Sequence, residues 1–333
     1  MARVVVYDAF GGPEVLRVVD EPVPSPGPGE VRVRIEAFAV NPLDVMMRAG
    51  TSPAPVAFPG ARLGIEGTGV VDELGEGVTG LAVGAPVILS AVPDATTNGS
   101  YADYVCVPAQ RVIARPEGLD VAQSAAVWVG FSTAYGALVE KAGMRPGDTI
   151  LVNAASGSVG RAAIGLARQL GAVPVALTRQ VTTRVSLLDA GAAAVVVVDN
   201  GTDGVTDSGN LAAVVQDITH GQGADIVLDL VDGPGQADLV TVLRPGGVLV
   251  AAGFFDLRPA SLPFAPITIH RYRGFEHTLD PVVVRRMAAS MHAGVRLGAV
   301  RPLVDRAFAF DDVAAAQRHL EAGAGQGKTV IVT

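Results

Sequence analysis

Residues 149–172 read TILVNAASGSVGRAAIGLARQLGA, a strand, a turn of small residues and a helix in direct succession. The apolar run at the start is typical of a buried strand, and Val159–Leu170 has the apolar spacing of a helix. Between them, Ala154, Gly157 and Gly160 follow the spacing of a dinucleotide-binding turn, with alanine in the first glycine position. Small residues let backbone N–H groups approach a pyrophosphate at the helix N-terminus. A tight turn that binds nothing is the alternative interpretation.

The segments up to Gly253 continue this alternation of strand and helix. Their strands are largely apolar, which is typical of parallel strands that are covered on both faces. The pattern therefore predicts an α/β fold with a doubly wound parallel sheet of the Rossmann type. We expect strands at 173–178, 193–199, 225–231 and 247–253, and helices at 181–189, near 211–219 and near 235–243.

Residues 1–115 have a different texture, with short Val-rich runs separated by Gly- and Pro-rich turns. Such regular short runs predict a small barrel or an irregular sandwich. After Gly253 the strand–helix alternation stops, and the chain ends in β-texture around one further helix. We therefore interpret the nucleotide-binding domain as an insertion into a β-rich domain. The predicted boundaries are 1–122 for the β-rich part, 123–265 for the nucleotide-binding domain and 266–333 for a return segment that completes the first domain.

Composition excludes several classes of protein. The 333 residues are 49% hydrophobic and 17% charged, with a net charge of −8, which argues against a nucleic-acid binder. One cysteine, Cys106, excludes a disulfide framework and a multi-cysteine metal site. The apolar runs are strand-sized and the first residues do not resemble a secretion signal, so we expect a cytoplasmic protein without membrane spans. Only Lys141 and Lys328 are lysines among 25 basic residues, which is typical of GC-rich coding bias.

The end of the second nucleotide-domain strand indicates which dinucleotide would bind. An NAD site places an acidic residue there to bind the ribose hydroxyl. Here Thr178, Arg179 and Gln180 follow instead, with Arg184 close by. Guanidinium groups suit a 2′-phosphate, so NADP(H) is favoured over NAD(H). Solvated surface arginines are the alternative.

The chain resembles the zinc-free quinone oxidoreductase branch of the medium-chain dehydrogenase/reductase superfamily along nearly its full length. The resemblance implies a GroES-like catalytic domain around a Rossmann domain, with NADPH in the cleft between them. It also implies homodimers formed through the edges of the nucleotide-domain sheets. Among the matching segments are FGGPEVL (10–16), NPLDVMMRAG (41–50), LGIEGTGVV (63–71), GSYADYVCVP (99–108), GADIVLDLVDG (223–233) and LRPGGVLVAAG (243–253).

The same comparison predicts a site without metal. Zinc-dependent relatives carry a cysteine near Asn41 and a histidine at the position of Ile65, and a catalytic zinc needs about three protein ligands. Neither ligand is present, and Cys106 lies outside such a motif. We expect Glu66 to be structural and to hold backbone groups or an arginine.

Without zinc, the easier chemistry is hydride addition from NADPH to a quinone or an α,β-unsaturated carbonyl. The candidate catalytic residues are Asn41 as a hydrogen-bond donor, Thr133 against the cofactor and Arg48 for substrate orientation. Asn41 could instead be a loop residue that bonds its own backbone. Thr133 could simply pack within a helix, and Arg48 could form a structural ion pair. Many relatives have a tyrosine near Met46, and methionine cannot donate a proton. Solvent, Tyr135 or His270 would then protonate the product.

Two further sets of residues complete the predicted site. Arg271 and Arg273 would meet a carboxylate or phosphate on the substrate, or they would lie on a solvated strand edge. For Trp128, Phe254 and Phe255, the alternative to a role in the site is packing in the core. The predicted activity is reduction of a small-molecule quinone or unsaturated carbonyl. The alternatives are a dedicated enoyl reductase that tailors a polyketide-like intermediate and a non-catalytic NADPH-binding protein. The cofactor set is Ala155, Ser156, Gly157, Ser158, Val159, Gly160, Thr178, Arg179, Arg184, Gly253, Phe254 and Phe255, and the substrate-pocket set is Met46, Ile65, Trp128, His270 and Arg271.

Overall fold

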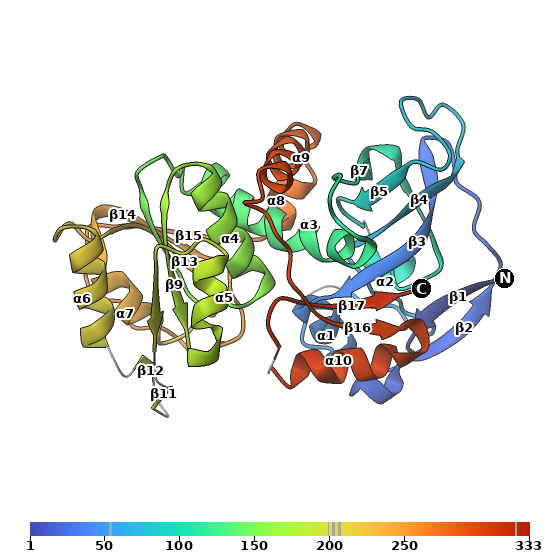
Figure 1. Ribbon diagram of the computed structural model, residues 1–333. Coiled ribbons are helices and arrows are strands. Elements are labelled where there is room, and N and C mark those ends of the chain that lie inside the picture. Colours follow the sequence, from blue (N-terminus) through green and yellow to red (C-terminus); the bar gives the residue numbers. More distant parts are fainter. Residues whose placement is uncertain (53–54, 93, 199, 202–203, 206–207, 324) are drawn as a thin grey trace. The chain divides into compact units, whose positions relative to one another are not determined.

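The structure is a computed structural model that describes residues 1–52, 55–92, 94–198, 200–201, 204–205, 208–323 and 325–333 (Figure 1). The chain divides into two compact units, 1–128 with 302–333, and 129–301. The first boundary lies inside helix α3 (Val121–Tyr135). The second unit continues well beyond the predicted return at residue 266. Strand β15 (Thr268–Arg271) extends the parallel sheet of this unit, so the chain returns to the first unit only at residue 302.

The second unit is built on a six-stranded sheet in the order β10-β9-β8-β13-β14-β15. Every neighbouring pair is parallel, which confirms the doubly wound sheet. The chain reverses its direction of travel across the sheet between β8 and β13, and ligands bind at such a switch point. The strands are β8 (Thr149–Val152), β9 (Val173–Thr178), β10 (Ala194–Val197), β13 (Ala224–Asp229), β14 (Leu243–Ala251) and β15.

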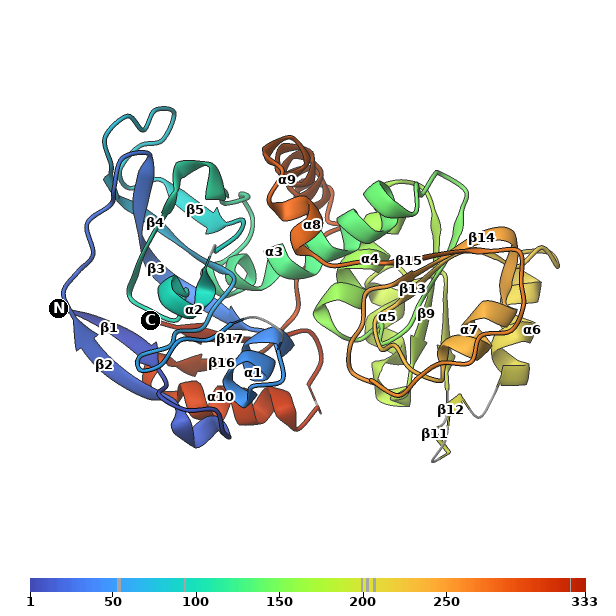
Figure 2. The same cartoon turned by 180° about the vertical axis from the view of Figure 1, so that it is seen from behind.

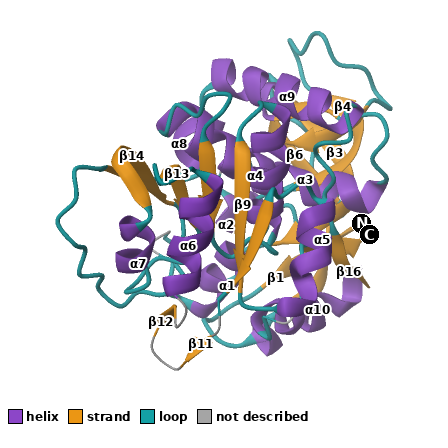
Figure 3. Ribbon diagram, turned by 60° about the vertical axis from the view of Figure 1, so that its left-hand side comes forward, coloured by secondary structure: helices purple, strands orange, loops and turns teal. Residues whose placement is uncertain are grey.

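Helices cover both faces of this sheet (Figures 2 and 3). Alternate residues of β9 point to opposite faces, so Ala176 joins one apolar cluster and Val175 joins the other. The Ala176 cluster packs under α4 (Ser158–Gln169) and α5 (Arg184–Asp189), and the Val175 cluster packs under α6 (Ser208–Ile218) and α7 (Gln236–Thr241). The other elements are a π-helix (Gly136–Lys141), a 3-10 turn (Val181–Thr183), β11 (Asn200–Gly201), β12 (Gly204–Val205), α8 (Phe275–Thr278) and α9 (Pro281–Arg296).

The first unit confirms the predicted β-rich domain. Its described residues form a seven-stranded sheet in the order β16-β17-β3-β4-β5-β7, and β6 also pairs with β3. A separate hairpin joins β1 and β2. The strands are β1 (Ala2–Val6), β2 (Arg17–Glu21), β3 (Glu30–Val40), β4 (Gly67–Leu74), β5 (Pro86–Leu89), β6 (Tyr104–Pro108), β7 (Val112–Ala114), β16 (Val304–Ala309) and β17 (Lys328–Val332), and the helices are α1 (Pro42–Ala49), α2 (Ala95–Asn98) and α10 (Val313–Glu321), with 3-10 turns at Pro13–Val15, Ala109–Arg111 and Phe310–Asp312.

Helix α1 follows Asn41 directly and was not expected from the sequence. Asn41 has extended backbone and is the N-cap residue, Pro42 takes the first helical position, and Gly50 ends the helix with φ at +75°. Each of these residue types is favoured at its position. The Asp44 carboxylate accepts a hydrogen bond from the Asn41 backbone N–H at 2.8 Å, which is the reciprocal half of a capping box.

Candidate cofactor and substrate sites

The turn between β8 and α4 has the local geometry of a phosphate-binding turn. Ala154 adopts φ of +44°, a left-handed conformation that glycine adopts more easily. Gly157 caps α4 with extended backbone and carries no side chain to satisfy the first N–H groups of the helix. A Cβ atom at Gly157 would meet only the Ala154 carbonyl oxygen, at 3.4 Å. The helix N-terminus is therefore accessible to an anion.

Close packing between Gly160 and Ala155 explains why the motif has small residues at these two positions. A Cβ atom on Gly160 would lie 2.6 Å from the Cα atom of Ala155, so the first helical turn packs directly on the preceding turn. Ala155 is fully buried, and its backbone N–H donates to the Leu177 carbonyl at 3.1 Å. Ala155 is thus a packing residue, which corrects its predicted contact with the cofactor. Ser156, Gly157, Ser158 and Val159 are half-buried along the turn and the start of the helix.

The end of β9 carries the residues that were predicted to select the dinucleotide. Thr178 is buried, and its hydroxyl lies 2.8 Å from the Thr183 hydroxyl, which closes the turn that leads into α5. Arg179 and Arg184 are both exposed on this short connection. Within the described part of the chain, no salt bridge involves either guanidinium. Both groups can therefore bind a phosphate without first losing a carboxylate partner.

A polar cluster at the switch point was missing from the prediction. The Asn153 side chain donates to Asp229 Oδ1 at 2.5 Å and accepts from the Leu230 N–H at 2.5 Å. Asp229 also accepts from the Gln236 side chain at 2.8 Å. The cluster fastens the carboxyl ends of β8 and β13, the two strands on either side of the switch point. The sequence did carry a signal for this cluster. Asn153 directly follows the apolar strand β8, and Asp229 is the last residue of the apolar strand β13.

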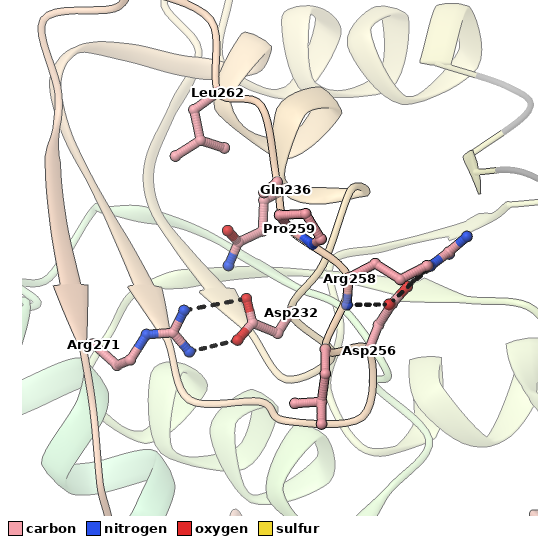
Figure 4. Close-up of a pocket in the computed structure, with 9 residues that line it drawn as sticks. Asp232, Gln236, Asp256, Arg258, Pro259, Leu262 and Arg271 are labelled. Atoms are coloured by element: carbon pink, nitrogen blue, oxygen red, sulfur yellow. Dashed lines mark hydrogen bonds and ion pairs between the residues drawn. The ribbon is translucent and has the colours of Figure 1, made fainter.

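A pocket of about 420 Å³ lies beyond the carboxyl ends of β13, β14 and β15 (Figure 4). Arg271 is paired with Asp232 and Arg258 with Asp256, so each cation of this pocket already has a carboxylate partner. An anionic substrate group would bind Arg271 in competition with Asp232. The residues that line the pocket are Asp232, Gln236, Asp256, Leu257, Arg258, Pro259, Ala260, Leu262 and Arg271.

Other predicted residues of the second unit lie near this sheet edge or on α3. Gly253 follows β14, and a Cβ atom there would lie 2.2 Å from the Leu230 carbonyl carbon, so the close backbone contact requires glycine. Phe254 and Phe255 are exposed and stack with their ring centroids 5.4 Å apart. His270 is half-buried on β15 and Arg273 is exposed. Thr133 is half-buried on α3, with its Oγ1 3.5 Å from the Cβ position of Gly274.

In the first unit, three buried polar side chains meet at one end of the seven-stranded sheet. The register pairs Val40 with Thr329 and Phe38 with Gly67, which brings Asn41, Lys328 and Glu66 together. Lys328 Nζ donates to Glu66 Oε1 at 2.8 Å and to Asn41 Oδ1 at 2.5 Å. Asn41 Nδ2 donates to the same carboxylate oxygen at 3.0 Å. Glu66 is fully buried and pairs with a lysine, where the prediction named backbone groups or an arginine.

Asp44 forms a second buried centre beside this group. Its carboxylate accepts from the Asn41 N–H at 2.8 Å, the Gly64 N–H at 3.2 Å and the Tyr101 hydroxyl at 3.1 Å. Burial raises the pKa of Asp44 to about 7, although the hydrogen bonds from Asn41 and Tyr101 act to lower it. Burial likewise raises the pKa of Tyr101 well above its ordinary value.

Two predicted substrate contacts are scaffold residues. Arg48 is 2% exposed and donates to Gln317 Oε1 at 2.9 Å and Glu321 Oε1 at 2.5 Å, so it joins α1 to α10. This is the structural ion pair that was the alternative interpretation, and it corrects the prediction of a substrate-orienting arginine. Trp128 is 1% exposed and donates its indole N–H to the Ser90 carbonyl at 2.6 Å, which places it in the core. Near Asn41, Met46 is half-buried and Ile65 is 8% exposed.

Neither a metal-ligand group nor a membrane-spanning helix is found. Among the residues that the structure describes, no three His, Cys, Asp or Glu side chains come together in a way that could hold a metal ion. The predicted absence of zinc stays a prediction. Over the same residues, no helix combines the length and the apolar character needed to cross a bilayer.

Comparison with known proteins gives the class of the chain. Residues 27–117 match the family model of the alcohol dehydrogenase GroES-like domain, and residues 190–331 match that of zinc-binding dehydrogenases. A quinone oxidoreductase of Pseudomonas aeruginosa is 30% identical over 345 residues, which cover 100% of both chains. A mycocerosic acid synthase-like polyketide synthase of Mycolicibacterium smegmatis is 35% identical over 246 residues, 72% of this chain and 11% of the synthase.

Solved structures give the same class. A structure described as an NAD-dependent alcohol dehydrogenase has a TM-score of 0.84 at 31% identity and covers 99% of both chains. A mycobacterial protein in complex with NADPH has a TM-score of 0.85 at 27% identity, with 99% of this chain and 100% of that chain covered. The fold and these matches define a medium-chain dehydrogenase/reductase. Within that superfamily, the chain belongs to the quinone oxidoreductase branch.

Proposed function

We propose that this chain is an NADPH-dependent oxidoreductase that reduces a quinone or an α,β-unsaturated carbonyl compound. The observation that carries the proposal is the pairing of an accessible α4 N-terminus with two exposed arginines at the end of β9. A pyrophosphate and a 2′-phosphate need these two kinds of group. The NADPH complex of the mycobacterial relative supports NADPH as the cofactor. Another relative is described as NAD-dependent, so the preference for NADPH over NADH should be tested directly.

The residues of the second unit fit such a cofactor. Gly157 leaves open space in front of the α4 N-terminus, where the N–H groups of Ser158 and Val159 would bind the pyrophosphate. Arg179 and Arg184 would bind the 2′-phosphate. Gly253, Phe254 and Phe255 follow β14, in the half of the sheet where the second mononucleotide of a Rossmann fold lies. When bound, NADPH supplies a hydride.

The first unit supplies a candidate donor for the substrate. Reduction of a quinone or a conjugated carbonyl places negative charge on the carbonyl oxygen, and a preorganised hydrogen-bond donor stabilises that charge. Asn41 is our candidate because its amide orientation is fixed by Glu66 and Lys328. Met46 and Ile65 supply apolar surface near it. Thr133 in the second unit stays a candidate for contact with the cofactor.

The test is NADPH oxidation with a panel of quinones and simple enones as acceptors. Turnover with either class supports the proposal. A protein that binds NADPH at micromolar concentration and reduces neither class would be a non-catalytic NADPH-binding member of the fold.

A second candidate function is enoyl reduction of a biosynthetic intermediate. The 35% identity to part of a polyketide synthase favours it, and Met46 leaves a pocket without a phenol donor at that position. Enoyl thioesters would then be reduced with a kcat/KM well above that of any quinone in the same assay. The reverse preference would leave quinone or enone reduction as the function.

We also propose that the reaction needs no zinc, because the described residues bring no three metal-ligating side chains together. Treatment with a chelator should leave turnover unchanged, and metal analysis should find zinc far below one ion per chain. Loss of turnover on chelation with recovery on added zinc would contradict this.

We further propose that two copies associate through β15, which with β10 is an edge strand of the described six-stranded sheet. Ile269 on this strand is 48% exposed, and Phe264 just before it is fully exposed. An exposed edge strand with apolar side chains is a surface for pairing with another strand. Ile269→Lys should convert a dimer to a monomer in sedimentation analysis. Leu297→Lys, at an exposed leucine of this unit outside β15, is the control that should stay dimeric.

A further inference from the structure

Lys328 is an unusual residue in this chain. Arginine takes 23 of the 25 basic positions, so a lysine stands out where the coding bias would favour arginine. The other lysine, Lys141, keeps 31% of its side chain exposed and pairs with Glu276 at 2.6 Å. The Lys328 side chain is 5% exposed, and its partner Glu66 is fully buried. A buried ammonium is costly to desolvate, so its retention calls for a specific role.

The contacts of Lys328 fix the polarity of one amide. Asn41 Oδ1 accepts from the Lys328 ammonium at 2.5 Å, and Asn41 Nδ2 donates to Glu66 at 3.0 Å. If the amide turned over, its N–H groups would face the ammonium and its oxygen would face the carboxylate. Both contacts would be repulsive in a buried setting, where electrostatic interactions are strong. The amide therefore has one orientation.

This orientation leaves one hydrogen of Asn41 weakly bonded. Nδ2 carries two hydrogens, and the second lies toward the Ala39 carbonyl oxygen at 3.4 Å. That distance exceeds the usual range of about 2.7–3.2 Å for an N–H···O bond. This hydrogen is therefore the one that Asn41 could turn to a substrate oxygen. Because Asn41 is only 2% exposed, the substrate would have to reach it at the buried end of the sheet. The Lys328 ammonium is compact and reaches both acceptors with its single nitrogen, at 2.5 and 2.8 Å.

We propose that Lys328 is a positioning residue that acts through Asn41: it holds the amide so that the second Nδ2 hydrogen is presented to the carbonyl oxygen of the substrate. This inference rests on the proposed function of Asn41. It gives the buried Lys328 ammonium a role in the reaction in addition to its role in the fold. Loss of Lys328 should lower kcat and leave the KM for the acceptor and the affinity for NADPH nearly unchanged.

The test is a double-mutant cycle of Lys328→Met and Asn41→Leu. We expect Lys328→Met to lower kcat by about 10- to 100-fold, since an oxyanion donor is worth about 100-fold or more when removed outright. Adding Asn41→Leu should lower kcat little further, because both changes remove the same donor. Unchanged kcat in Lys328→Met, or losses that multiply in the double variant, would overturn the proposal. Lys141→Met is the matched control and should keep full kcat.

A second pair of variants separates positioning from folding. Lys328→Met leaves Glu66 buried without its cation, which destabilises the fold. Glu66→Gln with Lys328→Met removes both charges together and should restore the thermal midpoint without restoring kcat. Lys328→Arg keeps a cation that can donate to Asn41 and Glu66, and should retain more kcat than Lys328→Met. Full kcat in the double variant Glu66→Gln with Lys328→Met would show that Lys328 serves the fold alone.

A readout without turnover keeps this inference separate from the proposed function. If the wild type reduces no quinone, enone or enoyl thioester, the proposed function fails. The positioning of Asn41 is then judged from the NMR signals of its side-chain amide. We expect one well-dispersed pair of amide signals in the wild type, and signals shifted and broadened toward random-coil positions in Lys328→Met with Glu66→Gln. Unchanged signals in the variant would overturn the role of Lys328.

Discussion

A Cβ atom on Gly160 would lie 2.6 Å from the Cα atom of Ala155, so the first turn of α4 packs on the phosphate turn with no room for a side chain. Gly160→Ala should push the helix away from the turn. We expect a loss of about 1–3 kcal/mol in the free energy of unfolding, as for other overpacked sites. The affinity for NADPH should fall at least tenfold, since displaced N–H groups no longer meet the pyrophosphate.

Chemical denaturation and a fluorescence titration with NADPH measure these two effects. Gly235→Ala is the matched control, because Gly235 has negative φ and a Cβ atom there would meet nothing within 4 Å. Its effect on both quantities should be small. Equal effects of the two substitutions would show that the close contact at Gly160 is not needed.

The left-handed backbone of Ala154 leads to a substitution that should stabilise the protein. A non-glycine residue pays about 1–2 kcal/mol for this conformation, and glycine does not. Ala154→Gly, at φ of +44°, should therefore raise the free energy of unfolding by about 1 kcal/mol. Urea denaturation tests this. Ala237→Gly within α7 is a control of opposite sign and should lower stability by about 1 kcal/mol. Destabilisation by Ala154→Gly would contradict the expected strain.

The sheet of the second unit was predictable because its signals are local. The strands β8, β9, β10 and β13 are largely apolar runs, and a helix follows each of them along the chain. The phosphate turn was also predictable, since its strand, turn and helix are adjacent in sequence. The boundary at residue 266 was misplaced because the place of β15 depends on its pairing with β14, which the local pattern of 268–271 does not reveal.

The candidate site in the first unit was only partly predictable. Asn41 and Glu66 could be named from the sequence, but Lys328 lies 287 residues from Asn41 and reaches it only through the register of β17 with β3. The partners of Arg48 are 269 and 273 residues away. Helix α1 was missed although its N-cap asparagine, Pro42 and Gly50 were all present, because eight residues give little apolar periodicity.

The exposed arginines at the end of β9 set the expected preference for NADPH. A charge-assisted hydrogen bond is worth about 1.5–3 kcal/mol, so Arg179→Ala or Arg184→Ala should weaken NADPH binding by about 10- to 100-fold. Binding of NADH should stay nearly unchanged, because it lacks the 2′-phosphate. Isothermal titration with both dinucleotides measures this. Arg285→Ala, an exposed arginine on α9, is the control. Tighter binding of NADH than of NADPH by the wild type would contradict the assignment of both arginines.

The buried carboxyl group of Asp44 should make stability depend on pH. Its pKa in the folded protein is raised from 3.8 to about 7, mainly by burial, so folding favours the protonated form. This contribution to stability is complete below about pH 4 and is lost as the pH rises through about 7. One pKa unit corresponds to about 1.4 kcal/mol, so the loss between pH 5 and 8 should be about 3 kcal/mol.

Comparison of the wild type with Asp44→Asn isolates this group from all others that titrate. The free energy of unfolding of the wild type should fall relative to that of the variant by about 3 kcal/mol between pH 5 and 8. Tyr101→Phe removes a hydrogen bond that lowers the pKa of Asp44, and should therefore shift the fall to higher pH. Denaturation curves collected at each pH test both statements. A constant difference between the wild type and Asp44→Asn would mean that Asp44 keeps one protonation state over this range, in which case the donors around it outweigh the effect of burial.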